Sequence, residues 1–494
     1  MREPGPRRLW PLIPFAGLLL LPAGWAVAAV AAAAVGLVAV RVLRRRQWAR
    51  ETETRRVRGA TVIGSDRAGR ALALGDDQLS AHGLIVGASG AGKSTTLLSI
   101  LTDHIQRGRP VVAIDMKGSP AFAQALADAA AAAGHPFRVW SPDGLDFWNP
   151  LAHGNATELK DKLIATERFT EPHYKRAAER YVQLALKTLH DTHPERPATL
   201  DDVVDAMDPQ RLVALVRQRP PSDAARVHDY VSSLTPDQTS AIRGLGTRLA
   251  IISESHTGRF LSPPAGTDPI DLRRALDGNE VVLFSLNSSR YGQLAAQLGA
   301  LAVQDLVTAV GSRFSDPEGS HPQATVAIDE FSGLGADHPL ALLARSRGAG
   351  VSVLLATQEF ADLDRAGRGF RDQVLGNTAV KIIHRQDVPS SADTVAQMAG
   401  TVKRWETSQQ VGPLGGYTGR GVRREVERFA VHPNDIKGLR TGEAVIIVKQ
   451  PAPGVATVRV APPRPGPVRM TPPRPGPVRR EPERGRGRGG PELG

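Results

Sequence analysis

Short, largely apolar runs recur along the chain and alternate with segments whose apolar residues have helical spacing. These runs lie at 84–86, 111–115, 137–140, 281–286, 324–329, 351–356 and 380–383. Between the later runs, the pattern predicts helices near 291–313, 339–347 and 388–399. Strands that are apolar on both faces and alternate with helices are typical of a parallel sheet covered on both sides. The pattern therefore predicts an α/β domain with helices on both faces of its sheet.

A long middle stretch breaks this alternation. From about Thr157 to His256 the pattern is helical, and strand signals are scarce. One apolar helical face is marked by Ala178, Tyr181, Val182, Ala185 and Leu189. We therefore expect an all-helical insertion within the α/β domain. The expected boundaries are 51–80 for a linker or strand-rich lead-in, 81–155 for the first part of the domain, 156–260 for the insertion and 261–461 for the second part.

The N-terminal region contains 32 consecutive residues without a charge, from Leu9 to Val40. As one helix they would extend about 48 Å, which exceeds the roughly 30 Å hydrocarbon core of a membrane. Arginines flank both ends, and Pro22-Ala23-Gly24 is a candidate turn. These features favour a hairpin of two short spans with both ends in the cytoplasm. One tilted span and a cleaved signal peptide are the alternatives. Residues 1–50 are therefore predicted to be a membrane anchor.

The net charge of +12 is concentrated at the two ends of the chain. Residues 1–60 carry +8 and residues 462–494 carry +5, so the sequence between them is close to neutral. The total charge is therefore weak support for DNA binding. Residues 462–494 repeat a Pro/Arg/Gly motif and cannot bury a core, which predicts a disordered tail. The chain has no cysteine, which excludes disulfides and thiolate metal sites.

The segment Gly87–Ser94 reads GASGAGKS and fits the phosphate-binding pattern G-x-x-x-x-G-K-[ST]. It follows a predicted strand and precedes a predicted helix, so backbone N–H groups and a helix N-terminus can surround a phosphate. We expect Lys93 to reach the β- and γ-phosphates and Ser94 to bind Mg²⁺. A flexible loop is the alternative. The predicted ligands are ATP and Mg²⁺, and the predicted binding residues are Gly87, Ala88, Ser89, Gly90, Ala91, Gly92, Lys93, Ser94 and Thr95.

A P-loop site needs an acidic group for the metal and for the attacking water, and two predicted strands end in aspartate. Asp329 is followed by Glu330, so Asp329 is the candidate ligand of Mg²⁺ and Glu330 the group that polarises water. A solvated acidic pair at a strand end is the alternative. The other strand ends in Asp115, with Lys117 two residues later. That pair could equally be a helix N-cap and a surface lysine.

Two arginines, Arg345 and Arg347, lie between the Asp329 strand and the next predicted strand. Ring-shaped motors place an arginine here to stabilise charge at the γ-phosphate of a neighbouring subunit. Cations at a solvated helix end are the alternative. Gln358 follows the next strand, where it either orients water or caps the strand. The candidate catalytic residues are Lys93, Glu330, Arg347, Arg345 and Gln358.

Several short motifs together resemble the FtsK/HerA branch of P-loop ATPases. They are HGLIVGASGAGKS at 82–94, VVAIDMKG at 111–118, IDEF at 328–331, RSRG at 345–348 and ATQ at 356–358. Within that branch the chain looks most like the type IV secretion coupling proteins of the TraD/TraG group. The N-terminal membrane segment, the helical insertion after Trp148-Asn149-Pro150-Leu151, and Gly376-Asn377-Thr378 support that group. The resemblance covers about 82–450.

The resemblance implies a RecA-like P-loop NTPase fold and a role for each candidate residue. Lys93 and Ser94 would bind nucleotide and Mg²⁺, and Asp329 and Glu330 would serve hydrolysis. Gln358 would be the sensor of the γ-phosphate. Arg347 would act in trans on a neighbouring subunit, and Arg345 is close enough in sequence to exchange roles with it.

The resemblance also implies a membrane-anchored ring ATPase, expected to be a hexamer, that couples ATP hydrolysis to DNA translocation in conjugation. The implied partners are DNA with bound relaxase and secretion-channel proteins. The implied location is the bacterial inner membrane, with the ATPase domain in the cytoplasm. A HerA/FtsK-like translocase in DNA processing or defence and a docking receptor with structural ATP are the alternatives. The short membrane segment and the lack of an FtsK-type winged-helix domain depart from the wider pattern.

Overall fold

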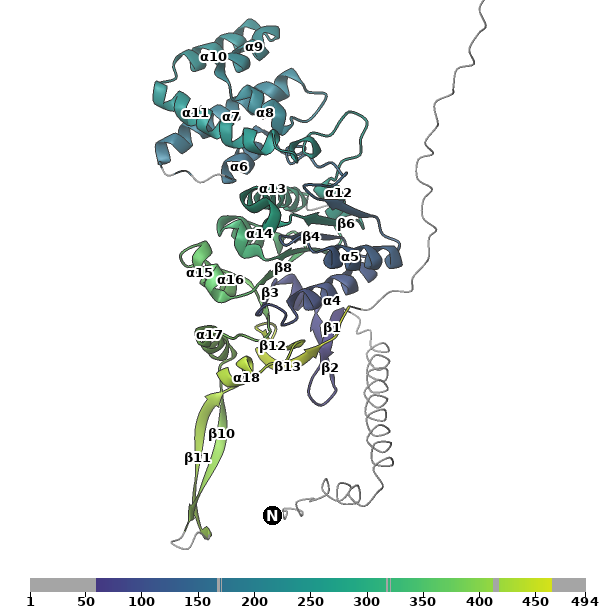
Figure 1. The fold of residues 1–494 in the computed structure, drawn as a ribbon, viewed down its shortest axis with the longest axis vertical. Helices are drawn as coiled ribbons and strands as arrows, with labels where there is room; N and C mark the ends of the chain where they lie inside the picture. Colours follow the sequence, from purple (N-terminus) through teal and green to yellow (C-terminus); the bar gives the residue numbers. More distant parts are fainter. Residues whose placement is uncertain are drawn as a thin grey trace, which may run out of the picture.

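The computed structural model describes residues 59–166, 169, 171–316, 319, 321–411 and 417–463. Figure 1 shows three parts in a row, with a group of helices at one end, a sheet with its helices in the middle and a two-stranded ribbon at the other end. The ribbon consists of β10 Thr401–Val411 and β11 Tyr417–Phe429, between α17 Pro389–Ala399 and α18 Pro433–Lys437. The predicted membrane anchor and all but two residues of the predicted tail lie outside the described residues. Both therefore stay predictions.

Within the described residues, eleven strands form one sheet in the order β2-β1-β13-β12-β9-β3-β8-β7-β4-β6-β5. The strands from β9 to β5 run parallel, and the other four join the sheet antiparallel. This arrangement confirms the α/β fold predicted from the apolar runs. The bounds are β1 Ala60–Ser65, β2 Ala71–Gly75, β3 Gly83–Val86, β4 Val111–Asp115, β5 Phe137–Trp140, β6 Val281–Ser285, β7 Ala324–Asp329, β8 Val351–Thr357, β9 Val380–Ile383, β12 Glu443–Val448 and β13 Gly454–Val460.

Successive side chains of the central strands enter two different cores, one on each face of the sheet. On β4, Val111 and Ala113 belong to the core that contains residues of α4 and α5. Val112 and Ile114 belong to the core on the opposite face, with residues of α13 and α14. A strand buried on both faces must be apolar throughout, which explains the continuous runs. The helices around the sheet are α3 Asp76–Ser80, α4 Lys93–Gln106, α5 Pro120–Ala133, α12 Leu272–Asp277, α13 Ser288–Phe314, α14 Asp337–Ser346, α15 Phe360–Ala366 and α16 Phe370–Asn377.

Some parts of the sheet differ from the prediction. The lead-in at 51–80 contains β1 and β2, in agreement with its strand-rich alternative, but both strands belong to the sheet, which therefore begins at Ala60 and not near Ala81. The β12 strand was missed, although its apolar run Ala444–Val448 has the same signal as the other strands. β13 was missed because its outer half is exposed and carries no apolar run.

Between Ala156 and Phe260 the described residues contain helices and no strand. The bounds are α6 Ala156–Ala165, α7 Pro172–Thr192, α8 Leu200–Ala206, α9 Pro209–Leu215, α10 Pro221–Ser232 and α11 Pro236–Ser253. The apolar face expected from the spacing of Ala178 to Leu189 is the buried face of α7. A buried ion pair joins α6 to the sheet domain, because Lys162 Nζ lies 2.9 Å from Asp305 Oδ1 of α13. The other Asp305 oxygen accepts from the Trp148 indole N–H at 2.9 Å.

One helix of the described residues, α13, is long and apolar enough to cross a membrane. Buried positions make up 67% of its most apolar window. Its apolar side chains belong to the larger of the two cores. The length and composition of α13 therefore match its place as the central helix on one face of the sheet.

Candidate nucleotide-binding site

The loop Gly87–Gly92 joins β3 to α4 at the carboxyl ends of the parallel strands. Gly90 and Gly92 have φ values of 72° and 122°, backbone conformations that residues with a Cβ rarely adopt. The loop is closed by the Ala91 N–H, which donates to Ala88 O at 3.1 Å. The backbone itself therefore requires these glycines. Of the predicted binding residues, Gly87, Ala91 and Lys93 are buried, Ala88, Gly92 and Ser94 are partly buried, and Ser89, Gly90 and Thr95 are exposed.

His384 packs against this loop, and it was missed in the sequence because it matches no phosphate-binding motif. Its Nδ1 lies 2.9 Å from Glu443 O and its Nε2 lies 2.8 Å from Thr96 Oγ1. A Cβ on Gly87 would lie 2.5 Å from His384 Cβ, and a Cβ on Gly92 would lie 3.2 Å from His384 Cε1. Burial lowers the pKa of His384 to about 4. The imidazole is therefore neutral at neutral pH, with Nδ1–H donating to the carbonyl.

Lys93 and Ser94 are the first two residues of α4, directly after the loop. Lys93 Nζ donates to Gly87 O at 2.6 Å, and Ser94 Oγ donates to Asp329 Oδ2 at 3.3 Å. Asp329 is buried, and its Oδ1 has no hydrogen-bond partner among the described residues. Buried polar atoms are normally paired, so an unpaired carboxylate oxygen beside a P-loop serine fits a ligand of Mg²⁺. The two residues predicted to hold the metal thus lie together.

The sequence left two interpretations open for Asp115 and Lys117, and in the structure the two residues have different roles. Asp115 accepts hydrogen bonds from the backbone N–H of Lys117 at 2.9 Å and of Ser119 at 2.6 Å, so it stabilises the turn before α5. Lys117 is more than a surface lysine, because its Nζ lies 2.8 Å from Glu330 Oε2. Burial alone would lower the pKa of Lys117, but Asp329 and Glu330 raise it above its ordinary value.

Glu330 has a backbone conformation that is uncommon for a residue with a side chain, with φ 61° and ψ 44°. Such strain persists only where the surroundings hold it, and it gathers at functional sites. Gln358, just after β8, donates from Nε2 to Glu330 Oε2 at 3.1 Å. Side chains that follow two strands, β4 and β8, therefore converge on the carboxylate that follows β7, the strand between them. The Gln358 side chain does more than cap its strand.

Two buried carboxyl groups dominate the electrostatics of the site. Asp115 and Asp329 are register partners on β4 and β7. Burial raises the pKa of each carboxyl above its ordinary value, because loss of water disfavours the charged form. Lys93 and Lys117 are the nearby cations, and burial lowers the pKa of Lys93. The strand ends therefore favour the binding of a further cation.

Arg345 and Arg347 lie at the end of α14 and do not join this cluster. Both side chains are exposed, and neither makes a hydrogen bond or ion pair with another of the described residues. Their position leaves them available to a second molecule. Their predicted role in a neighbouring subunit stays a prediction.

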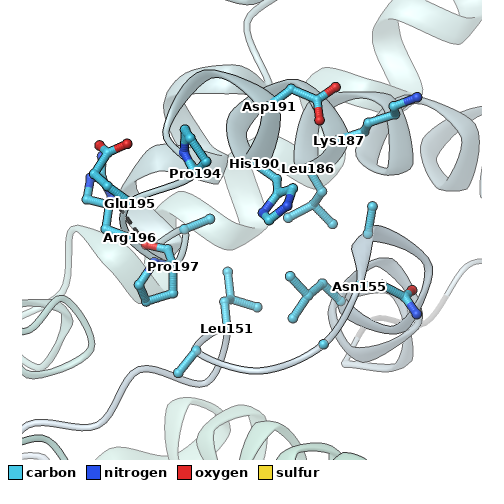
Figure 2. A pocket seen from close by; sticks show the side chains of 15 residues that line it. Leu151, Asn155, Leu186, Lys187, His190, Asp191, Pro194, Glu195, Arg196 and Pro197 are labelled. Atoms are coloured by element: carbon cyan, nitrogen blue, oxygen red, sulfur yellow. Dashed lines mark hydrogen bonds between the residues drawn. The ribbon is translucent and has the colours of Figure 1, made fainter.

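A cavity of about 450 Å³ lies apart from the P-loop, where the helical insertion joins the sheet domain (Figure 2). Its walls come from the segment before α6 and from the carboxyl end of α7, with Leu151, Leu186 and Pro197 among the lining residues. Figure 2 shows Lys187, His190, Asp191 and Glu195 on the α7 side. None of the predicted site residues lines this cavity.

The family model described as the type IV secretion-system coupling protein DNA-binding domain matches residues 70–461. The chain belongs to this family. The resemblance drawn from the motifs is thereby confirmed. A search of curated protein sequences finds no significant match to this coupling protein.

Solved structures share the fold of this coupling protein at low sequence identity. The bacterial conjugative coupling protein TrwBΔN70 matches with a TM-score of 0.61 and 15% identity, covering 82% of this chain and 90% of that chain. TrwB in complex with ADP and Mg²⁺ matches with a TM-score of 0.56 and 16% identity, covering 84% and 93%. VirB4 of Thermoanaerobacter pseudethanolicus matches with a TM-score of 0.52 and 13% identity, covering 82% and 96%. These matches establish a common fold.

We expect His384 to make the coupling protein less stable as the pH falls. An unfolded histidine takes up its proton near pH 6.5, whereas folded His384 does so near pH 4. Between these values the unfolded state binds more protons, so the free energy of unfolding decreases with falling pH, by at most about 3 kcal/mol. Urea denaturation across this window should show a shallower decrease for H384Q than for the parent. H228Q, at an exposed histidine of the helical insertion, is the control. Equal slopes for H384Q and the parent would contradict the buried neutral imidazole.

Proposed function

We propose that this coupling protein is a membrane-anchored, ring-forming ATPase that couples ATP hydrolysis to DNA translocation in conjugative transfer. The observation that supports it best is the convergence of Lys117, Glu330 and Gln358 beside the P-loop. The solved complexes of TrwB with an ATP analogue and with ADP and Mg²⁺ support ATP and Mg²⁺ as ligands here. The DNA-binding domain named by the family model supports DNA as the partner.

The P-loop would hold the phosphates through its backbone N–H groups and the Lys93 ammonium. Ser94 and Asp329 would hold Mg²⁺, which when bound neutralises charge on the phosphate oxygens. His384 would keep the loop in place by its contact with Thr96 and its packing under Gly87. These residues bind and orient the nucleotide.

Glu330 would orient the attacking water and accept its proton. Lys117 Nζ and Gln358 Nε2 both contact Glu330 Oε2. Oε1 makes no hydrogen bond with the described residues, so it can accept one from a water molecule. A purely structural nucleotide site would have no use for a carboxylate held in this way. The geometry therefore favours hydrolysis over a docking receptor with structural ATP.

The ring is proposed because Arg345 and Arg347 are exposed and unpaired within the described residues. Arg347 would reach the γ-phosphate in a neighbouring subunit, with Arg345 as the alternative, and six subunits are the expected number. Residues 9–40 would anchor each subunit in the bacterial inner membrane, with the ATPase domain in the cytoplasm. The helical insertion would meet DNA and its relaxase, and the membrane side would meet secretion-channel proteins.

Replacing Glu330 by glutamine should reduce ATP hydrolysis by roughly a hundredfold or more, the usual contribution of a general base. Single-turnover hydrolysis of bound ATP measures the effect, and nucleotide affinity should stay close to that of the parent. The parent's rate should rise with DNA, and E171Q in the helical insertion is the control. E330Q turning over as fast as the parent would favour the docking receptor. Absence of DNA stimulation in an active parent would argue against DNA as the substrate.

Mixing two inactive variants tests the arginine in trans. K93A lacks the phosphate-binding lysine, and R347A lacks the arginine, so each alone should be inactive. In a mixed ring, the intact P-loop of an R347A subunit can face the intact Arg347 of a neighbouring K93A subunit, which completes one site. Random mixing gives this order at about a quarter of interfaces. ATPase activity should return to roughly that fraction. Mixed rings recovered by two affinity tags but inactive would rule out Arg347, and the same mixture with R345A would then test Arg345.

A further inference from the structure

His82 lies directly before β3, the strand that leads to the P-loop, and has no contact with the candidate residues of the nucleotide site at the other end of that strand. It is 3% exposed, and its φ of 68° is a backbone conformation that residues with a Cβ rarely adopt. Such a conformation costs free energy and persists only where the surroundings hold it. The contacts of His82 therefore have to outweigh that cost.

The imidazole of His82 joins the start of β8 to the end of α14. The Val353 N–H donates to Nδ1 at 3.1 Å, so Nδ1 is the acceptor and Nε2 carries the hydrogen. Nε2 lies 3.1 Å from Leu343 O and therefore donates to it. Burial, together with the nearby charge of Arg347, lowers the pKa of His82 to about 4. The imidazole is thus neutral at neutral pH, as the hydrogen bond to Nδ1 requires.

The hydrogen bond from His82 stabilises the last turn of α14. The last four carbonyl groups of a helix lack partners within it, and Leu343 carries the first of these four in α14. Ser346, the final residue of α14, is buried, and its hydroxyl donates to Leu342 O at 2.6 Å. Side chains therefore bind two neighbouring carbonyl groups near the end of this helix, which hold its last turn in place.

This turn carries the two arginines predicted to act in trans. Arg345 and Arg347 flank Ser346 in sequence, and both are exposed while Ser346 is buried. Beyond the turn, the Gly350 N–H donates to Arg347 O at 3.2 Å. Gly350 O in turn accepts from the Ala324 N–H at 3.1 Å, at the start of β7. The backbone of Arg347 is therefore tied to the sheet, while its side chain faces solvent.

Arg347 lies at the opposite edge of the sheet from the P-loop of its own subunit. The P-loop and Glu330 follow the carboxyl ends of β3 and β7, whereas the turn after α14 precedes the amino end of β8. β8 has 7 residues, which extend over about 20 Å. An arginine side chain does not bridge this length, so a phosphate that contacts Arg347 belongs to another molecule.

The strand β3 connects these two edges directly. Its 4 residues separate His82 from Gly87, the first residue of the P-loop. All four are buried, and β3 pairs in parallel with β8 on one side and with β9 on the other. One central strand therefore carries the P-loop of its own subunit at one end and the support of α14 at the other.

We propose that His82 is a positioning residue that holds the end of α14 and thereby presents Arg347 to the nucleotide of a neighbouring subunit. The action of Arg347 in trans rests on the proposed function, whereas the support of α14 by His82 does not. Loss of His82 would then impair hydrolysis in the neighbouring subunit and leave nucleotide binding in its own subunit intact. A histidine that only fills the core would affect its own subunit.

Replacing His82 by asparagine tests the support of α14. Asparagine tolerates a positive φ, and its Oδ1 can accept from the Val353 N–H in place of Nδ1, but it has no group that reaches Leu343 O. In the full chain we expect H82N to show faster backbone hydrogen exchange at 346–350 and parent-like exchange in β8. H104N removes another buried histidine and is the control, with both segments unchanged. Unchanged exchange at 346–350, or an equal acceleration in β8, would overturn the proposal.

Mixed rings test the action in trans. H82N alone should hydrolyse saturating ATP roughly tenfold more slowly than the parent, with a KM close to the parent's, because a displaced Arg347 weakens only the reaction. An equal amount of inactive K93A should raise the activity to about a quarter of the parent's. The reason is that a K93A subunit presents a correctly held Arg347 to the P-loop of a neighbouring H82N subunit. Activity that only falls in proportion to the added K93A would contradict positioning in trans.

The mixture of R347A with K93A separates failure of this proposal from failure of the proposed function. If K93A rescues R347A but not H82N, His82 does not position the arginine and the proposal is wrong. If R347A is as active as the parent, or is not rescued, the assignment of Arg347 in the proposed function is wrong. The hydrogen exchange of H82N then still decides whether His82 supports α14.

Discussion

Two buried carboxyl groups, Asp115 and Asp329, lie side by side at the ends of β4 and β7, and the site is organised around the need to stabilise them. Asp115 is satisfied by two backbone N–H groups of the turn that follows it. Asp329 has Ser94 on one oxygen and no partner among the described residues on the other. The unpaired oxygen and the raised pKa of both groups make a divalent cation the natural complement of this arrangement.

The parallel sheet brings further polar side chains to the same edge as these two carboxyl groups. In-register strands end in a row, so side chains distant in sequence meet at one edge without a long loop. Lys117 after β4 and Gln358 after β8 thus both reach Glu330 after β7. On the other side of the P-loop strand, the segment from His384 to Gly442 connects β9 to the antiparallel β12. This segment carries the two-stranded ribbon, and its two ends contact the P-loop and the helix that follows it.

The features that could be predicted from the sequence are those set by local physical constraints. Strands buried on both faces must be apolar, and the glycines of the P-loop are required by the backbone, so both were visible without a structure. The tasks of Lys117 and His384 were not visible, because each depends on a partner more than 200 positions away. The ribbon was missed because it is exposed on both faces, which removes the apolar alternation that marks a strand. Arg345 and Arg347 stay open because their predicted partner is another subunit.

The stabilisation of the protein by Mg²⁺ and ATP tests the central role of Asp329 most directly. Thermal unfolding of the parent and of D329N is measured without nucleotide, with ATP and EDTA, and with ATP and Mg²⁺. We expect D329N to be the more stable protein without nucleotide, because the buried charge is gone. We also expect Mg²⁺ to raise the melting temperature of the ATP-bound parent and to have little effect on that of D329N. An equal Mg²⁺-dependent increase in both proteins would contradict the role of Asp329 as the ligand of Mg²⁺.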